Sequence, residues 1–477
     1  IYRKCPTVVI ATVDKFARLP WDPSCNSLFG RVNRYCPSHG YIATGQKHSG
    51  YHNGTPKISV RRIDPFFPPE LIVQDELHLI TGPLGTIYGA YEAAIEELCS
   101  VELEGRIITP KYVVSTATIR NAESQIRALY GRKDAMQFPA NGLDVKDSFF
   151  TKEIPIEDSP FRKYIGICAS GKSMKTTELR VYAILIQKAF ELSENPKYAD
   201  FIDPYYTLIG YFNSIRELGG TVRLLQDDIL KRIKWIKKHN NHSKERFFKF
   251  REITSRMRTD QIAGLLKDLE VNKDEKDKGN KDFVDVAIAT NMISVGLDID
   301  RLGLMCVFGQ PKQSSEYIQT TSRIGRAHPG LVVTIYSPYR PRDLSHYENF
   351  KGYHSQIYRF VEGTTATPFS ARARDRVLHA LFIALARLTI QDLAENEAAN
   401  NISDIDPSLI DSIIAKIAKR VAKVSPKLQP DVVRELQQFV DDWKMLQRVS
   451  TDKLYYFVTE TTKYSRLMNY YGEICTS

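Results

Sequence analysis

Two adjacent acids and a histidine form the sharpest chemical signal in this sequence of 477 residues. Asp75, Glu76 and His78 follow a short apolar run, Leu-Ile-Val-Gln, at 71–74. Such a run is typical of a buried parallel strand, and α/β sheets bind ligands at the carboxyl ends of these strands. There Asp75 could hold a magnesium ion, and Glu76 could orient or deprotonate a water molecule. Taken alone, the tetrapeptide Asp-Glu-Leu-His at 75–78 is also typical of a solvated turn.

Two arginines farther along the chain could stabilise charge on a transferring phosphate. Residues 319–326 read QTTSRIGR, so Gln319 opens the segment and Arg323 and Arg326 lie three residues apart. On one helical face behind a glycine-containing turn, two guanidinium groups can form a fork around phosphate oxygens. The alternative is that both arginines form ordinary surface ion pairs.

Small polar residues end two further strand-like runs. Thr116 and Thr118 belong to a Ser-Thr-Ala-Thr segment, which suits a hinge that senses a neighbouring site. Thr290, Gly296 and Asp298 belong to a second segment, ATNMISVGLD, which follows another apolar run. Neither segment is diagnostic by itself.

The elements around these groups predict an α/β fold. Apolar runs that suit strands alternate with stretches that have apolar residues at helical spacing, as in a parallel sheet covered by helices. The expected strands lie at 7–13, 70–74, 112–118, 163–168, 205–212, 284–289, 304–308 and 331–336. From about 369 the strand pattern stops and amphipathic helices follow.

Changes in these patterns divide the chain into three parts. We expect a first lobe at 1–155, with a polar insertion at about 20–69, a second lobe at 156–368, and a mainly helical region at 369–477. The charged tract at 271–282 is expected to be a loop.

Basic residues concentrate in one segment. The formal net charge is +10, and residues 231–258 carry eleven Lys or Arg against two Glu. Aromatic residues such as Trp235 lie among them, a mixture that binds phosphate backbones and stacks on bases. Lys234, Lys237 and Lys238 are therefore predicted to contact nucleic acid, with a solvated helix face as the alternative.

The cellular setting follows from what the sequence contains. Its seven cysteines are scattered, which favours a reducing compartment over a disulfide framework. No apolar run approaches the roughly 20 residues of a membrane span. We expect a cytoplasmic protein.

In their order along the chain, the segments described above resemble the motifs of superfamily 2 helicases. Residues 75–78 resemble motif II, 115–118 motif III, 289–300 motif V and 319–326 motif VI with its two arginine fingers. The resemblance covers about 7–340 and implies two RecA-like lobes that bind ATP between them.

The resemblance also implies roles for single residues. The implied catalytic residues are Asp75, which would hold Mg²⁺, with Glu76, His78, Gln319, Arg323 and Arg326. The implied ATP contacts are Thr290, Gly296 and Asp298. Residues 11–14 look like motif Ib and 211–219 lie where motif IV belongs, so the implied nucleic-acid contacts are Thr12, Thr116, Thr118, Asn213 and Arg216.

Several longer stretches are similar, more narrowly, to the large helicase subunit of the bacterial DISARM anti-phage systems. They include TVDKFARLPW, YFNSIRELGG and NMISVGLDIDRLGLM. The similarity implies DNA as the substrate, phage defence as the context, and a partner subunit in a defence complex.

The helicase motifs require a phosphate-binding loop before motif II, and no Gly-Lys-Ser or Gly-Lys-Thr precedes Asp75. The pattern G-x-x-x-x-G-K-[ST] occurs instead at 166–173, which includes Lys172. Because it follows motif III, we interpret it as a chance match. We expect the chain to start inside the first lobe and, as given, to hydrolyse ATP slowly or not at all.

The insertion holds a candidate metal site. Cys36 and His39 are spaced C-x2-H, and His48 and His52 are spaced H-x3-H, which a tetrahedral zinc site could use. Cys25 could replace one of these ligands. The alternative is a chance grouping in a polar loop.

Two other functions remain open. One is a catalytically inactive nucleic-acid-binding or scaffolding module with a helicase shape. The missing phosphate loop favours it for the chain as given, whereas the intact acids and arginines argue against it for the parent protein. The other is an unrelated P-loop NTPase that uses Lys172. That enzyme would need an acid pair at a later strand end, for which Asp285 and Asp298 are poor candidates.

Overall fold

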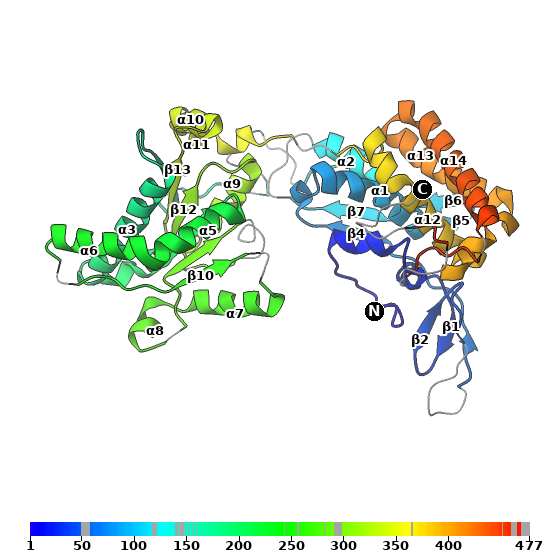
Figure 1. The fold of residues 1–477 in the computed structure, drawn as a ribbon, viewed down its shortest axis with the longest axis horizontal. Helices are drawn as coiled ribbons and strands as arrows, with labels where there is room; N and C mark the ends of the chain where they lie inside the picture. The colour runs from blue at the N-terminus through cyan, green and yellow to red at the C-terminus, as the bar shows by residue number, and fades with distance from the viewer. Residues whose placement is uncertain are drawn as a thin grey trace. The chain divides into compact units, whose positions relative to one another are not determined.

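The chain divides into two compact units in the computed structural model (Figure 1). Unit 1 combines residues 1–137 with 363–477, and unit 2 comprises residues 138–362, so unit 2 is inserted in the sequence of unit 1. The structure describes all residues except 49–57, 117–121, 139–142, 144–146, 148, 151, 156, 160, 243, 255–256, 281, 291–297, 364–365, 451, 459–464 and 469–477.

A parallel sheet forms the centre of unit 2. Across its described residues the strand order is β10-β11-β9-β12-β13-β8, and each neighbouring pair is parallel. The strands are β8 (Arg162–Cys168), β9 (Leu208–Phe212), β10 (Phe250–Ile253), β11 (Val286–Ala289), β12 (Leu304–Phe308) and β13 (Gly330–Tyr336).

Helices cover both faces of this sheet. Leu208 and Phe212 of β9 pack with α3, α5 and α6, whereas Ile209 and Tyr211 pack with α7 and α9 on the other face, because successive strand residues point to opposite sides. This is a RecA-like α/β arrangement. The helices are α3 (Met174–Ser193), α4 (Asp203–Tyr206), α5 (Ile215–Arg223), α6 (Ile229–His239), α7 (Thr259–Glu270), α8 (Lys273–Asp277), α9 (Ser314–Thr321), α10 (Pro341–Glu348) and α11 (Phe350–Ser355).

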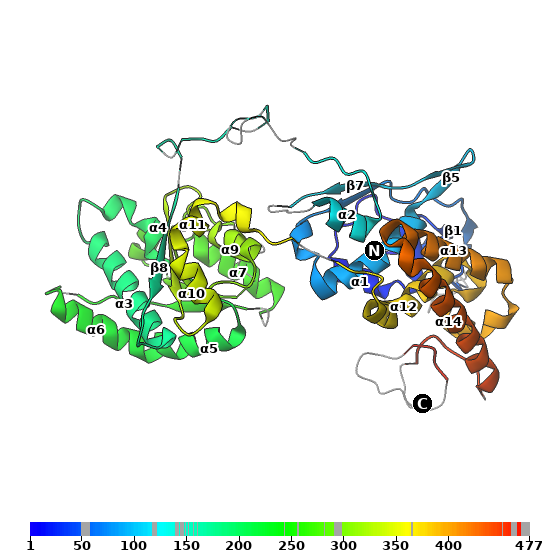
Figure 2. The ribbon, with the colours of Figure 1, turned by 90° about the horizontal axis from the view of Figure 1, so that it is seen from above.

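Unit 1 joins a short parallel strand pair to a helical layer. Strands β4 (Leu71–Gln74) and β7 (Lys111–Val114) pair in parallel. Helix α1 (Gly82–Cys99) shares one hydrophobic core with α12 (Ala371–Thr389), α13 (Pro407–Val424) and α14 (Gln429–Val449) (Figure 2). The helices expected after 369 therefore complete the core of the unit that begins at residue 1.

The remaining elements of unit 1 are short. The predicted insertion contains a three-stranded sheet in the order β2-β1-β3, and β5 and β6 form an antiparallel hairpin. These elements include the 3-10 helices η1 (Val13–Arg18) and η2 (Pro23–Phe29), strands β1 (Val32–Cys36), β2 (Gly40–Ala43), β3 (Arg61–Arg62), β5 (Val101–Leu103) and β6 (Arg106–Ile108), and helix α2 (Ala122–Tyr130).

The α/β class is confirmed, but several local predictions are wrong. The expected strand at 7–13 is absent, and Val8 and Ile10 are 75% and 96% exposed. The expected loop at 271–282 contains α8, where the Asn272 side chain accepts a hydrogen bond from the Glu275 amide and so caps the helix. Strand β10 was not predicted, because its exposed charges hide the alternation of an edge strand. Among the described residues, no helix is long and apolar enough to cross a membrane.

Candidate active site

The acidic pair lies where two parallel strands of unit 1 end together. Gln74 of β4 is in register with Val114 of β7, so Asp75 and Ser115 are the next residues on neighbouring strands. The Ser115 hydroxyl donates a hydrogen bond to Asp75 Oδ1, and the Ser115 amide donates to the Gln74 carbonyl at 2.9 Å. The register thus joins the predicted motif II to the predicted motif III.

A second set of contacts holds the histidine. His78 Nδ1 lies 3.3 Å from Glu76 Oε2 and 3.2 Å from Thr116 Oγ1, and only 4% of the His78 residue surface is exposed. Glu76 adopts a left-handed backbone conformation with a φ of 52°, which is strained for a residue with a side chain. The buried Gln125 amide donates to the carbonyls of Leu77 and Ile80 and fixes the loop beneath. The structure therefore brings Asp75, Glu76, His78 and Thr116 together at the joined ends of β4 and β7.

The two arginines lie on a turn of unit 2 rather than on a helical face, which corrects the expectation. Helix α9 ends at Thr321, and Arg323 and Arg326 follow it. Gly325 has a φ of +68°, and a Cβ there would lie 2.9 Å from the Gly330 backbone. Arg162 on β8 donates to the Ile324 carbonyl at 2.7 Å and the Ser322 carbonyl at 3.1 Å. These contacts give the turn one defined shape.

The other predicted residues of motifs V and VI are only partly described. Thr290 is buried directly after β11, and Gln319 is buried on α9. Asp298 is exposed and forms an ion pair with Arg326. Gly296 lies outside the described residues. The Asp298–Arg326 pair links the end of the predicted motif V to motif VI.

The predicted nucleic-acid contacts have varied surroundings. The Asn213 amide donates to the carbonyls of Phe308 and Gly309 at 3.0 and 3.2 Å, so it ties the ends of β9 and β12 together. Arg216 is exposed on the first turn of α5, and Thr12 is exposed just before η1. Thr118 lies outside the described residues.

The basic segment splits into an exposed helix face and engaged residues. Lys234 and Lys238 of α6 are exposed, whereas Lys237 Nζ lies 3.9 Å from Glu245. Trp235 is 44% exposed and is flanked by the Arg232 guanidinium, 3.7 Å from its ring centroid. Arg246, in contrast, is buried and pairs with Asp285 at 2.7 Å. The candidate surface is therefore α6 rather than the whole segment.

The phosphate-loop pattern at 166–173 occupies the edge of the sheet in unit 2. Gly166 pairs with Thr334 inside the β8–β13 ladder, and Ser173 caps α3 by accepting the Thr176 amide. Lys172 is exposed in the turn between them. The neighbouring strand β13 is followed by Ser337 and supplies no acid pair, which supports the interpretation as a chance match.

Three of the four predicted metal ligands lie together in unit 1. The ligand atoms of Cys36, His39 and His48 are all within 4.8 Å of one another. His52 lies outside the described residues. Cys25 is buried, and its sulfur lies 3.6 Å from the Tyr2 hydroxyl.

Sequence reasoning placed Ser115 in the predicted motif III without a role of its own, and it missed Gln125 and Arg162. All three hold predicted residues in place. The parallel pairing of the two strands could have indicated Ser115, because neighbouring parallel strands end at one sheet edge. Gln125 and Arg162 act on backbone carbonyls far away in sequence, and no local pattern marks such contacts.

The chain matches a helicase domain family and a curated DISARM protein. Residues 226–328 of unit 2 match the family described as Helicase conserved C-terminal domain. Over 470 residues, or 98% of its length, the chain is 54% identical to the DISARM protein DrmA of Bacillus paralicheniformis. The chain is DrmA-like and of the helicase type. The DrmA-like chain spans 41% of the length of that relative, and the resemblance found in its motifs is confirmed.

Other matches to the DrmA-like chain are more distant. A stretch of 69 residues is 33% identical to Nucleolar RNA helicase 2-B of Xenopus laevis and covers 14% of this chain and 9% of that protein. The structure of the DUF1998 helicase MrfA bound to DNA and AMPPNP matches 78% of this chain and 39% of that chain, with a TM-score of 0.45 and 13% identity. The structure of Mycobacterium smegmatis helicase Lhr bound to ssDNA and AMP-PNP matches 78% and 38%, with a TM-score of 0.47 and 13% identity.

Proposed function

We propose that this chain is the motor segment of an ATP-dependent DNA translocase or helicase that works with partner subunits in phage defence. The observation that carries the proposal is the cluster at the joined ends of β4 and β7, where Asp75 contacts Ser115 and Glu76 contacts His78. A helicase needs this coupling, because the site that hydrolyses ATP must respond to the strand that is moved. The similarity to a DISARM protein supports the cellular context.

Each side chain of this cluster has a proposed role. Asp75 presents an exposed carboxylate, and oxygen ligands of this kind fit Mg²⁺, which prefers one or two carboxylates together with waters and phosphates. When bound, that ion would neutralise charge on the phosphate oxygens. Glu76 orients the attacking water, and His78 fixes the Glu76 carboxylate. Asp75 is itself held by the Ser115 hydroxyl.

The groups of unit 2 act in the same hydrolysis cycle. We assign Arg323 and Arg326 to the charge that develops on the transferred phosphate, and Gln319 to the support of that step. Thr290, Gly296 and Asp298 contact the nucleotide. Asp298 also pairs with Arg326 in the structure, so release of this pair would free the guanidinium for phosphate.

The nucleic-acid path is proposed from the exposed residues. Thr12 and Arg216 are open to solvent, and the α6 surface offers Lys234, Lys238 and a half-exposed Trp235. The lysines would contact phosphates, which gives binding with little sequence preference. The faces of the Trp235 ring are covered by Arg232 and His239, so we assign it no base contact. Thr116, Thr118, Asn213 and Lys237 complete the proposed set.

ATP hydrolysis with and without DNA tests the proposal. We would measure it for the chain as given and for a version extended at its N-terminus to include a Gly-Lys-Ser or Gly-Lys-Thr loop. Each would be compared with Glu76→Gln, which keeps the shape of the side chain and removes its charge. The expected result is hydrolysis by the extended version, stimulated by DNA more than by RNA and abolished by Glu76→Gln.

Other outcomes would favour the other functions. Tight DNA binding without hydrolysis in the extended version would favour the inactive binding module. Hydrolysis that survives Glu76→Gln and disappears in Lys172→Ala would favour a P-loop NTPase built on unit 2.

A further inference from the structure

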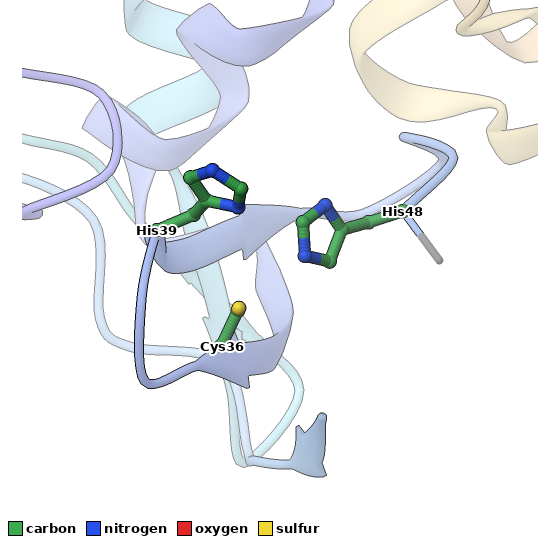
Figure 3. Close-up of side chains that lie close together, drawn as sticks. All are labelled: Cys36, His39 and His48. Carbon is green, nitrogen blue, oxygen red and sulfur yellow. The ribbon is translucent and has the colours of Figure 1, made fainter. Parts of the chain in front are cut away.

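Cys36, His39 and His48 lie together at one end of the hairpin formed by β1 and β2. Cys36 is the last residue of β1, His39 directly precedes β2, and His48 follows β2. Their sulfur and ring nitrogen atoms are all within 4.8 Å of one another. Figure 3 shows the Cys36 sulfur pointing toward the two imidazole rings, whose centroids are 5.2 Å apart.

The hairpin that carries these residues is firmly held. Gly40 has a φ of +88°, and a Cβ at this position would lie 2.1 Å from the Arg3 carbonyl oxygen, so only glycine fits. The same carbonyl accepts the Tyr41 amide at 2.9 Å. Cys36 and Ile42 are fully buried beneath the turn. The cysteine therefore has a fixed position, whereas His39 is exposed and can adjust.

The donor set has the chemistry of a zinc site. One thiolate and two imidazoles suit Zn²⁺, whereas Mg²⁺ and Ca²⁺ prefer oxygen ligands. With bonds of about 2.0–2.3 Å and tetrahedral angles, ligand atoms around zinc lie roughly 3.5 Å apart. The ligand atoms, now within 4.8 Å of one another, would have to approach by about 1 Å to reach that geometry. Rotation of the exposed His39 side chain can supply this movement.

We propose that Cys36, His39 and His48 bind one Zn²⁺ ion. The site shares no residue with the acids and arginines of the proposed motor, so the two proposals can succeed or fail independently. Zinc would tie the turn of the hairpin to His48, in the segment that follows β2.

Cobalt substitution and zinc titration test this proposal on the whole chain. After treatment with a chelator, the chain would be titrated with Co²⁺, which reports coordination by its absorption, and then with Zn²⁺. We expect one Co²⁺ per chain, a thiolate-to-cobalt charge-transfer band, and displacement of Co²⁺ by Zn²⁺. Cys36→Ser should abolish the band, and His39→Ala should weaken Zn²⁺ binding by at least about tenfold, since even loss of a residue that only supports a ligand costs 10–100-fold.

Matched controls separate metal binding from folding. Cys5→Ser in the same unit and His242→Ala in unit 2 should leave the titration unchanged. His39 is exposed, so His39→Ala should keep the circular dichroism spectrum of the apo chain even if Cys36→Ser does not fold. Failure of the original chain to bind Co²⁺ or Zn²⁺ at one equivalent would overturn the proposal, as would a charge-transfer band that persists in Cys36→Ser. Glu76→Gln should keep its zinc.

Discussion

The Ser115 hydroxyl donates a hydrogen bond to Asp75. Ser115 directly follows β7 and Asp75 directly follows β4, and these two parallel strands end in register. Both residues stand at one edge of the parallel pair in unit 1. Substitution of either residue therefore removes a hydrogen-bond partner of the other. In the proposed motor, this bond connects the Mg²⁺ ligand to the segment that would sense nucleic acid.

Removing this bond should slow hydrolysis without unfolding the chain. In the N-terminally extended version, we expect Ser115→Ala to lower the kcat of DNA-stimulated hydrolysis about tenfold, because hydrogen bonds to charged groups contribute roughly 1.5–3 kcal/mol. Ser115 is exposed and its truncation leaves no buried cavity, so the chain should fold, with a melting temperature lowered by no more than about a few degrees. Ser100→Ala, which removes a hydroxyl bonded to the Glu96 carbonyl in the same unit, is the matched control. Equal losses in both variants would contradict the role given to Ser115.

Arg162 should matter to hydrolysis although it belongs to no motif. Its guanidinium holds two carbonyls of the turn that carries Arg323 and Arg326. Arg162→Lys cannot form both bonds in the same geometry, so we expect the kcat of the extended version to fall by about tenfold or more with a small loss of stability. Lys163→Met, at an exposed position of the same strand, should leave kcat unchanged. The proposed arginine roles would be weakened if Arg162→Lys kept full activity.

Glu92 should make the stability of unit 1 depend on pH. Burial raises the pKa of this carboxyl to about 7 from an ordinary 4.5. The folded chain therefore binds the proton more tightly than the unfolded chain, and the free energy of unfolding should fall as pH rises from about 4.5 to 7. Across this window the free energy of unfolding should fall by about 3 kcal/mol at most. Above about pH 7, Glu92 should cause no further change.

Denaturant unfolding at several pH values would measure this effect. Glu92→Gln should remove the fall between about pH 4.5 and 7, because the amide does not titrate in this range. The Tyr112 hydroxyl, 2.5 Å from Glu92 Oε1, can still donate to the amide oxygen. Glu97→Gln on the same helix should keep the fall. An unchanged pH profile in Glu92→Gln would assign the effect to other groups.

The α6 surface should contribute two phosphate contacts to single-stranded DNA. The double substitution Lys234→Gln and Lys238→Gln should weaken binding and reduce the slope of log K against log salt by about 1.5, since each lost contact removes roughly 0.7–0.9. Lys231→Gln is the control, because Lys231 Nζ already lies 2.6 Å from Asp227. Fluorescence anisotropy at several salt concentrations would give both slopes. A slope that changes as much in the control would place the binding surface elsewhere.

Regular apolar patterns made much of the fold predictable. Strand β12 was expected at 304–308, and the structure has these bounds. Amphipathic helices were expected from about 369, and α12, α13 and α14 lie there, because a run or stripe of apolar residues fixes the face that must be buried. The run at 7–13 has the same composition, yet Val8 and Ile10 are exposed. Composition shows that a segment could be a strand, but it does not show that a neighbouring strand exists.

Contacts between segments far apart in sequence were not predictable in this way. Arg387 is 1% exposed and donates to the carbonyls of Pro20 and Ala394. In the sequence it lies in an amphipathic helix, where an arginine is normally assigned to the solvent face. At the site, the acids and histidine were predicted together because they are adjacent. The turn of Arg323 and Arg326 was expected to be helical, since spacing alone cannot reveal the left-handed Gly325.

The division of unit 1 into two sequence segments has a consequence for its synthesis. A ribosome makes residues 1–137 before unit 2, and it makes the helices that cover α1 only after unit 2. Unit 2 is continuous and can fold as soon as it emerges, whereas the buried face of α1 must wait for more than half of the chain. During that interval the nascent chain displays an apolar surface, which is a natural substrate for chaperones.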